Sequence, residues 1–388
     1  MKGDDAVGKI IGIDARKLEN NKAGIGNYTY NLIREILEID EHNTYILYTN
    51  NPIPIDFGKE NCILKCLPVK ARHRLTQKIK SPFWQNFNLR NKLIDDRVDI
   101  FFSPNFFKPL FYRGDAFLTI HDLTFITVPK AFSMIQRWYN RLFLFLSLQG
   151  RVEIFTVSNH SKQDILKHYR RIQENNVHIT YCAVDTSKFK PLSELELDRN
   201  ELVKKKYGLP DQYILFVGTI EPRKNLKSLL KSMSYLKQEG QSQLPLLICG
   251  SKGAGYQELI EQIEVLELKD HVKFTGYISD EDLPYLYANA TLFIYPSLYE
   301  GFGIPPLEAM ASGVPVITSN TSSIPEVVGE AAICIDPNNE KEMFEKIRLL
   351  LNDTQLRDKL IKQGLERATF FRWSNSARRF LSVLNQHG

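Results

Sequence analysis

Residues 213–225 read YILFVGTIEPRKN and carry the clearest signal of the fold. Its first five residues form a short apolar run typical of a buried strand, and a glycine followed by polar residues then indicates a loop. Residues 226–238 continue with apolar side chains at helical spacing, so the sequence predicts a strand–loop–helix unit. Arg223 and Lys224 lie side by side in that loop, between the carboxyl end of the strand and the start of the helix.

The same unit recurs along the chain in both directions. We expect further strands at residues 246–249, 272–274, 291–295, 314–317 and 332–335, and earlier ones at residues 9–14, 44–48, 100–103, 117–120 and 154–157. Helices are expected between them, for example at residues 27–37, 226–238 and 158–169, the last with polar caps in Ser158–Ser161. Short buried strands that alternate with helices predict parallel sheets covered on both faces.

The predicted architecture is α/β, with two doubly wound Rossmann-like domains that face each other across a cleft. We place an N-terminal domain at residues 1–200, a charged linker at 191–206, a C-terminal domain at 206–370 and a final helical segment at 371–388. In such folds ligands bind at the carboxyl ends of the strands.

Composition excludes several other protein classes. The 388 residues are 43% hydrophobic and 24% charged, which is unlike fibrous or disordered chains. The longest apolar run, residues 142–148, is far shorter than the roughly 20 residues of a membrane-spanning helix. No signal-peptide pattern is visible, and five scattered cysteines suggest free thiols, so we expect a cytoplasmic location.

The charge is unevenly distributed along the chain. Residues 1–205 carry a net charge of +8 and the remainder −3, which indicates an anionic partner for the first half. Between Lys65 and Arg97, aromatic residues interleave with basic residues, which are Lys65, Lys70, Arg72, Arg74, Lys78, Lys80, Arg90, Lys92 and Arg97. Two interpretations stay open: peripheral binding to the anionic inner face of the cell membrane, or a solvated basic face with core aromatics. Without a nucleic-acid-binding motif, we do not expect a nucleic acid partner.

The densest candidate site is residues 299–313, which read YEGFGIPPLEAMASG. Pro305 and Pro306 suit the first turn of a helix, so residues 301–304 are expected to form the loop that leads into it. Glu300 then lies at the start of the loop and Glu308 on the first turns of the helix. Backbone N–H groups at the helix start favour an anion such as a phosphate, and the two carboxylates could bind the hydroxyls of two sugars. The alternative is a capped helix with incidental acids.

Three other stretches carry candidate residues. Arg223 and Lys224 could neutralise a diphosphate, although a solvated basic helix start is the alternative. His121, after a predicted strand, could contact a sugar hydroxyl or carry a proton, oriented by Asp122 or by a backbone carbonyl, but an isolated histidine is more often structural. The glycines Gly24 and Gly26 open the first helix and match only part of a dinucleotide-binding pattern.

Other motifs are weaker. The acidic stretch Asp280–Asp282 favours helix capping over a metal–diphosphate site. No zinc-binding, Walker A or nucleophile-elbow motif occurs, so we expect no metal and no cofactor.

Taken in order, these motifs resemble the retaining nucleotide-sugar glycosyltransferases of family 4, which have the GT-B fold. The resemblance covers nearly the whole chain and is carried by Gly24–Gly26, His121–Asp122, Val157–Ser158, Gly218 with Glu221–Asn225, Gly276–Tyr277, and Glu300 and Glu308 followed by Ala309–Pro315. Within the family, residues 119–125 and 221–225 are most similar to bacterial mannosyltransferases of O-antigen or capsule polysaccharide synthesis. The resemblance implies a hexosyltransferase that uses a nucleotide-sugar donor, with GDP-mannose as the first expectation, and a glycan or lipid-diphosphate-linked acceptor.

The resemblance also implies roles for individual residues. Arg223 and Lys224 would hold the donor diphosphate, Glu300 would contact hydroxyls of the donor sugar, and Glu308 would bind the ribose. The remaining expected contacts are Phe302, Gly303 and Ile304 at the sugar and phosphates, Gly218 at the diphosphate strand, Gly276 and Tyr277 near the base, His121 beside the sugar, and Gly24 and Gly26 at the N-terminal loop. His121, Glu300, Arg223 and Lys224 are the residues expected to act in catalysis. Thr219 departs from the pattern, because some relatives have an arginine there.

A mechanism follows from the charges. As the sugar leaves the diphosphate, Arg223, Lys224 and the helix start would stabilise the leaving group in place of a metal. Retention ordinarily suggests a carboxylate nucleophile, but we can nominate none and favour a same-face substitution. A UDP-sugar donor, a sugar-nucleotide epimerase and a non-catalytic scaffold are the alternatives that stay open.

Overall fold

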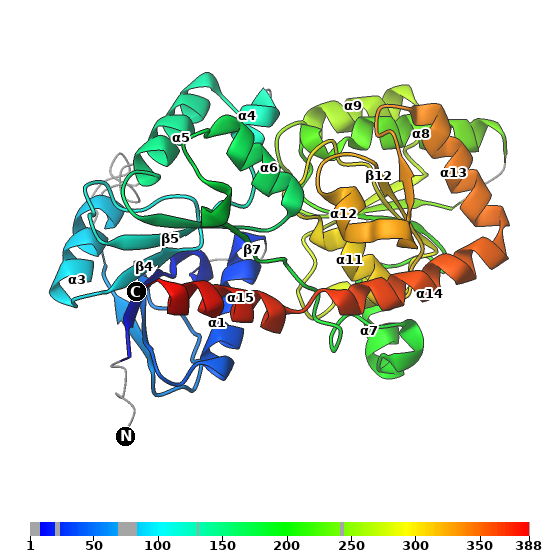
Figure 1. The fold of residues 1–388 in the computed structure, drawn as a ribbon. Coiled ribbons are helices and arrows are strands. Elements are labelled where there is room, and N and C mark those ends of the chain that lie inside the picture. The colour runs from blue at the N-terminus through cyan, green and yellow to red at the C-terminus, as the bar shows by residue number, and fades with distance from the viewer. Residues whose placement is uncertain (1–7, 20–23, 69–83, 130–131, 241–243, 388) are drawn as a thin grey trace. The chain divides into compact units, whose positions relative to one another are not determined.

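The computed structural model describes residues 8–19, 24–68, 84–129, 132–240 and 244–387 (Figure 1). The chain forms two compact units. Unit 1 comprises Met1–Cys182 together with Trp373–Gly388, and unit 2 comprises Ala183–Arg372. The chain thus passes into unit 2 well before the predicted boundary at residue 200. Among the described residues, no helix has both the length and the apolar character that a membrane span requires.

Unit 1 is built on a parallel sheet of seven strands. The strands are β1 (Ile10–Asp14), β2 (Thr44–Thr49), β3 (Cys62–Cys66), β4 (Ile100–Ser103), β5 (Asp115–Thr119), β6 (Val152–Thr156) and β7 (Val177–Ile179). Their order in the sheet is β3-β2-β1-β4-β5-β6-β7. This is the order of a Rossmann fold with one added strand, and the direction of winding reverses between β1 and β4.

Helices cover both faces of this sheet. Those of unit 1 are α1 (Ile25–Ile39), α3 (Arg90–Asp95), α4 (Thr124–Thr127), α5 (Met134–Ser147), α6 (Asn159–His168) and α15 (Trp373–Gln386), with shorter helical segments η1 (Arg16–Leu18), η2 (Trp84–Leu89) and η4 (Glu174–Asn176). Helix α15 packs against α1, whereas α5 and α6 lie on the opposite face of the sheet (Figure 1). On the two sides of β1 the chain winds along the sheet in opposite directions. Because each connection between parallel strands is right-handed, the helices of the two halves lie on opposite faces.

Unit 2 repeats the same topology with six parallel strands. They are β8 (Ile214–Val217), β9 (Leu246–Cys249), β10 (Val272–Gly276), β11 (Leu292–Tyr295), β12 (Val316–Ser319) and β13 (Ile333–Ile335), in the order β10-β9-β8-β11-β12-β13. The helices are α7 (Leu197–Tyr207), α8 (Leu226–Gln238), α9 (Tyr256–Val265), α10 (Leu283–Ala288), α11 (Ile304–Ala311), α12 (Ile324–Val328), α13 (Glu340–Asn352) and α14 (Thr354–Phe370), with short helical segments η5 (Leu192–Glu194), η6 (Pro222–Lys224) and η7 (Gly329–Ala331).

The predicted strands are confirmed to within a few residues, and two strands were not predicted. Both unpredicted strands, β3 and β7, lie at the edges of the first sheet. In β3, Lys65 follows three apolar residues, and Ile63 and Leu64 are exposed, so this strand is not a buried apolar run of the kind that marks the predicted strands. The predicted linker at residues 191–206 is wrong, because most of it forms α7, which packs on α10. Two charged partners of Asp282 stabilise that contact, as described below.

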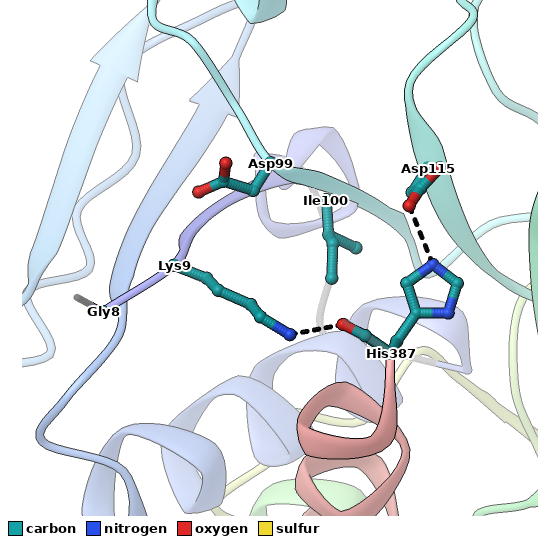
Figure 2. Close-up of a pocket in the computed structure, with 6 residues that line it drawn as sticks. All are labelled: Gly8, Lys9, Asp99, Ile100, Asp115 and His387. Atoms are coloured by element: carbon teal, nitrogen blue, oxygen red, sulfur yellow. Dashed lines mark hydrogen bonds and ion pairs between the residues drawn. The ribbon is translucent and has the colours of Figure 1, made fainter. Parts of the chain in front are cut away.

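The last helix ends in a shallow depression at the amino ends of β1, β4 and β5 (Figure 2). The depression has a volume of about 390 Å³. Lys9 Nζ donates a hydrogen bond of 2.9 Å to the carbonyl of Leu384, and His387 Nε2 lies 3.0 Å from an oxygen of Asp115. Ligands of doubly wound sheets bind at the opposite, carboxyl ends of the strands. We therefore interpret this depression as the anchor of α15 and not as a binding site.

Candidate functional site

The topology brings Arg223, Lys224 and Glu300 together in unit 2. Strands β8 and β11 pair in parallel, with Ile214 opposite Leu292, so their carboxyl ends are adjacent. The segment η6 with Arg223 and Lys224 follows β8, and Glu300 follows β11. The pair β8–β11 is also the point at which the winding direction of this sheet reverses, which is where doubly wound folds bind ligands.

One oxygen of Glu300 receives four side chains. Arg223 Nη1 lies 2.9 Å and Lys224 Nζ 2.6 Å from Oε1 of Glu300. The hydroxyls of Tyr295 and Ser297 donate to the same oxygen, at 3.0 Å and 2.5 Å. Among the described residues, no side chain is recorded as donating to the other oxygen, Oε2. The carboxylate is thus held through one oxygen by two cations and two hydroxyls.

The charges of this cluster are buried and nearly balanced. Lys224 is only 6% exposed and Glu300 8%. Burial by itself would raise the pKa of Glu300, but the charges of Lys224 and Arg223 and several hydrogen bonds lower it to about 2. Burial lowers the pKa of Lys224, and Glu300 opposes that change. Arg223 also pairs with Glu221, at 2.9 Å, so two cations meet two carboxylates in this cluster.

The loop after Glu300 is fixed by its neighbours. Gly303 has a positive φ of 106°, and a Cβ there would lie 2.5 Å from Cδ1 of Ile324, so only glycine fits. The hydroxyl of Ser323 lies 2.9 Å and 2.8 Å from the carbonyl oxygens of Glu300 and Phe302. The side chain of Phe302 is buried against Phe371, with ring centroids 5.3 Å apart. Phe302 can therefore contact a ligand only through its backbone.

The start of helix α11 offers fewer donors than the sequence suggests. Gly303 is the N-cap, and Ile304, Pro305 and Pro306 form the first turn. Proline has no N–H, so an anion at this end can be bound only by the N–H groups of Gly303 and Ile304.

Glu308 lies on the second turn of α11 and is paired with a tyrosine. The hydroxyl of Tyr287 donates to Oε2 of Glu308 at 2.8 Å. Burial raises the pKa of Glu308 to about 7, although the hydrogen bond from Tyr287 acts in the opposite direction. Two sugar hydroxyls that donate hydrogen bonds to this buried carboxylate would stabilise its ionised form.

The remaining predicted residues of unit 2 lie at neighbouring strand ends. Gly218 follows β8, and its N–H donates to the carbonyl of Cys249 at 2.8 Å. Gly276 ends β10 with a φ of 71°, and Tyr277 after it is largely exposed. Thr219 is exposed beside Gly218. Gly218 and Gly276 thus occupy the carboxyl edge of the sheet that contains the Glu300 cluster.

Three predicted residues belong to unit 1. His121 follows β5, and its Nε2 lies 2.8 Å from the carbonyl oxygen of Pro104. Its ring also packs edge-on against Tyr28 of α1, at 4.8 Å between centroids. Burial lowers the pKa of His121, which favours the neutral ring. Of the two orienting groups that the sequence left open, the described contacts favour a backbone carbonyl, because Asp122 instead accepts from the N–H of Thr124.

The glycines of the first helix have different environments. Gly24 is the exposed N-cap of α1 with a φ of 54°, and a Cβ there would meet nothing within 4 Å. Gly26 is buried inside the helix. A ligand could therefore approach the backbone at Gly24 more readily than at Gly26.

Several residues of the site were missed by sequence reasoning. Tyr295, Ser297 and Ser323 surround Glu300, and Tyr287 holds Glu308. The only sequence signal for Tyr295 and Ser297 was their place at the carboxyl end of a predicted strand.

The acidic stretch before α10 has a structural role different from the one predicted. Asp282 occupies the N-cap position but makes no side-chain cap. It instead pairs with Arg199 and Lys206 of α7, at 3.0 Å and 2.6 Å. The described residues also contain no group of three or more His, Cys, Asp or Glu placed to bind a metal.

The basic stretch at 65–97 is only partly described. Lys70, Arg72, Arg74, Lys78, Lys80 and Phe83 lie outside the described residues. Lys65 and Lys92 both pair with Asp96, and Trp84 is a fully buried core residue. Phe87, in contrast, is 56% exposed, so the described part leaves both interpretations of this stretch open.

Comparisons with known proteins identify the family. The model of the glycosyltransferases described as Glycosyl transferases group 1 matches residues 198–367, and that of Glycosyltransferase Family 4 matches residues 23–188. The chain is 37% identical over 285 residues to the O-antigen chain mannosyltransferase B of Escherichia coli, which covers 73% of each protein. It is 34% identical to the O-antigen chain mannosyltransferase RfbU of Salmonella typhimurium, over 60% of this chain and 59% of that protein.

A solved structure agrees in fold. WaaG, a glycosyltransferase involved in lipopolysaccharide biosynthesis, superposes with a TM-score of 0.74 over 96% of this chain and 99% of its own, at 16% identity. Two parallel Rossmann-like sheets, two family models that together span residues 23–188 and 198–367, and a relative matched over most of its length agree with one another. The chain therefore belongs to the family 4, group 1 glycosyltransferases and has the GT-B fold.

Proposed function

We propose that this glycosyltransferase transfers mannose from a nucleotide sugar, with GDP-mannose as the first candidate, to a glycan or lipid-linked glycan during surface polysaccharide synthesis. We further propose that the reaction retains the configuration of the sugar and needs no metal. The names of both curated relatives, which are O-antigen chain mannosyltransferases, support the sugar and the process. The observation that supports the chemistry best is the convergence of Arg223 and Lys224 on one oxygen of Glu300.

The leaving diphosphate would take over the cations of this cluster. Arg223 is shared between Glu221 and Glu300. A diphosphate beside them would draw the guanidinium and the Lys224 ammonium toward its oxygens as negative charge develops there. The N–H groups of Gly303 and Ile304 would bind a further phosphate oxygen. Glu300 would stay in place through Tyr295 and Ser297 and bind sugar hydroxyls with Oε2.

Glu300 is poorly suited to act as a nucleophile. Four donors on Oε1 and a pKa of about 2 stabilise its negative charge, which weakens its attack on a carbon. We therefore propose substitution on one face of the sugar. The bond from C1 to the phosphate oxygen breaks, the bond from C1 to the acceptor oxygen forms, and the acceptor's proton moves to the leaving phosphate oxygen. The neutral ring of His121 would serve as a contact for the donor sugar.

A lipid-linked acceptor would place the protein at a membrane. We propose a peripheral location on the inner face of the cell membrane, supported by the net charge of +8 in residues 1–205.

Glu308, with its partner Tyr287, would bind the ribose of the donor, and Tyr277 and Gly276 would lie near the base.

The test combines donor binding with product analysis. Thermal unfolding would be followed with GDP- and UDP-sugars in the presence of EDTA, for the wild type, Lys224→Ala and the exposed control Lys227→Ala. We expect GDP-mannose to stabilise the wild type and the control but not Lys224→Ala. NMR of the transfer product would then show whether the α configuration is kept.

Each alternative has its own outcome. Preference for a UDP-sugar would overturn the assignment of GDP-mannose, and an inverted product would overturn retention. Loss of activity in EDTA that Mg²⁺ restores would overturn metal independence. Turnover of the donor without transfer would indicate an epimerase, and no response to any nucleotide sugar would favour a scaffold.

A further inference from the structure

Helix α5 of unit 1 turns its apolar side away from the protein. The residues that it buries against the unit are Leu144 and Ser147. Its large exposed side chains are Met134, Ile135, Trp138, Tyr139, Leu142, Phe145 and Leu146. Ile135 is 82% exposed and Trp138 70%. A surface helix of a soluble protein normally has the reverse pattern, with its apolar stripe toward the core.

Helical geometry places the exposed side chains on one stripe. Ile135, Trp138 and Leu142 follow one another at spacings of three and four, which are the spacings of neighbours on one helix face. Leu144 and Ser147 lie on the opposite side and face the sheet. The stripe is therefore continuous, and a contiguous apolar surface of this kind marks an interaction site.

The charged residues of α5 itself have one sign. The helix contains no acidic residue and two basic ones, Arg137 and Arg141. A second copy of the chain would present the same basic surface and be repelled from a symmetric contact. An anionic lipid surface has the complementary charge, and Trp and Tyr are the side chains that favour its interface with water.

The helix is connected to the edge of the sheet where ligands bind. Arg16 follows the carboxyl end of β1 and donates to Gln85 at 3.3 Å. Gln85 donates to the carbonyl of Phe107 at 2.9 Å, and the ring of Phe107 contacts that of Tyr139 on α5. The loop of Phe107 also exposes Phe111, which is 83% accessible. A membrane bound at α5 would thus lie beside the carboxyl edge of the unit 1 sheet.

We propose that the exposed face of α5, with Phe111, is the surface by which this protein binds an anionic lipid bilayer. The proposal rests on the proposed function, because a lipid-linked acceptor gives the contact its purpose. It assigns membrane binding to residues 134–146 and not to the basic stretch at 65–97. Aromatic and aliphatic side chains would enter the interface, and Arg141 would contact lipid phosphates at its border.

The test measures co-sedimentation with vesicles of phosphatidylcholine, with and without phosphatidylglycerol. The variant Trp138→Glu/Leu142→Glu places two charges on the stripe. The matched control, Leu202→Glu/Val265→Glu, changes two exposed apolar residues of unit 2. We expect the wild type and the control to bind phosphatidylglycerol vesicles. The α5 variant should bind them more weakly, by a factor of roughly ten or more. Arg141→Gln should reduce the preference for the anionic lipid.

Other measurements separate this proposal from the proposed function. Stabilisation by the donor in the absence of vesicles should be unchanged in the α5 variant, which also shows that the variant is folded. Equal vesicle binding by the α5 variant and the wild type would overturn the proposal even if the donor binds. The wild type could instead fail to bind vesicles and form a dimer that the α5 variant does not form. That result would assign the exposed face of α5 to contact with a second copy of the chain. A wild type that binds vesicles but no donor would contradict the proposed function and leave the membrane-binding surface in place.

Discussion

Replacing Lys224 with methionine tests the charge cluster most directly. The change removes an ammonium that lies 2.6 Å from Oε1 of Glu300 and keeps a side chain of similar length. The pKa of Glu300 falls from an ordinary value of 4.5 to about 2 in the folded chain. Such a shift corresponds to about 3 kcal/mol in favour of the ionised form. Lys224 is the largest of the favourable causes, so we assign about 1–2 kcal/mol to it.

Two further effects adjust this free energy. Removing one partner of a buried ion pair costs about 3–5 kcal/mol when the other charge is left alone. Here Arg223, Tyr295 and Ser297 still bind Glu300, and the burial cost of Lys224 itself is relieved. We therefore expect a net loss of about 1–3 kcal/mol in the free energy of unfolding. For a domain the size of unit 2 this is a decrease in Tm of roughly 2–12 °C.

Calorimetry of the wild type, Lys224→Met, Glu300→Gln and the double variant measures this coupling. Lys227→Met is the control, because Lys227 makes a solvent-exposed pair with Glu258 and its loss should change the Tm little. Since the folded pKa of Glu300 is lowered, its contribution is present above pH 4.5 and lost as the pH falls toward 2. The difference in the free energy of unfolding between the wild type and Lys224→Met should therefore become smaller as the pH falls over that range. Additive effects of the two single changes, or a Tm equal to that of Lys227→Met, would refute the reasoning.

Three other variants have expected outcomes. Burial raises the pKa of Glu308 to about 7, so ionising this residue lowers the stability of the folded chain as the pH rises from 4.5 through 7. In calorimetry, the Tm of Glu308→Gln should therefore rise relative to that of the wild type over this range. A difference in Tm that does not change with pH would contradict this. Asp282→Asn breaks the pairs to Arg199 and Lys206, so hydrogen exchange in α7 should accelerate while that in α8 stays unchanged. Phe380→Ala removes a fully buried ring of α15 and should cost about 3–5 kcal/mol in urea unfolding, and a cost below about 1 kcal/mol would show that α15 is not part of the core.

Some features of the fold could be predicted from the sequence because their causes are local. The apolar runs at residues 213–217 and 291–295 and the helical spacing at 226–238 led to β8, β11 and α8 in nearly their final limits. Pro305 and Pro306 likewise marked the first turn of α11, because proline fits there and nowhere deeper in a helix.

The prediction failed where burial depends on distant residues. Residues 191–206 carry many charges and resemble a linker, but Asp282, far along the sequence, accepts the cations of α7 and holds it in unit 2. The strand β3 lies at the edge of its sheet and leaves its apolar residues Ile63 and Leu64 exposed, so its place could not be read from a buried apolar run.

The sequence by itself determined the types of residues at the site and the strand ends that carry them. Arg223, Lys224 and Glu300 were predictable because they follow β8 and β11, whatever their neighbours are. Only the tertiary structure decided that both cations bind the same oxygen of Glu300, that Tyr295 and Ser297 complete that contact, and that the apolar side of α5 faces outward. The physical reason is that charge pairing and burial depend on the distances between segments, which a local pattern of residues does not contain.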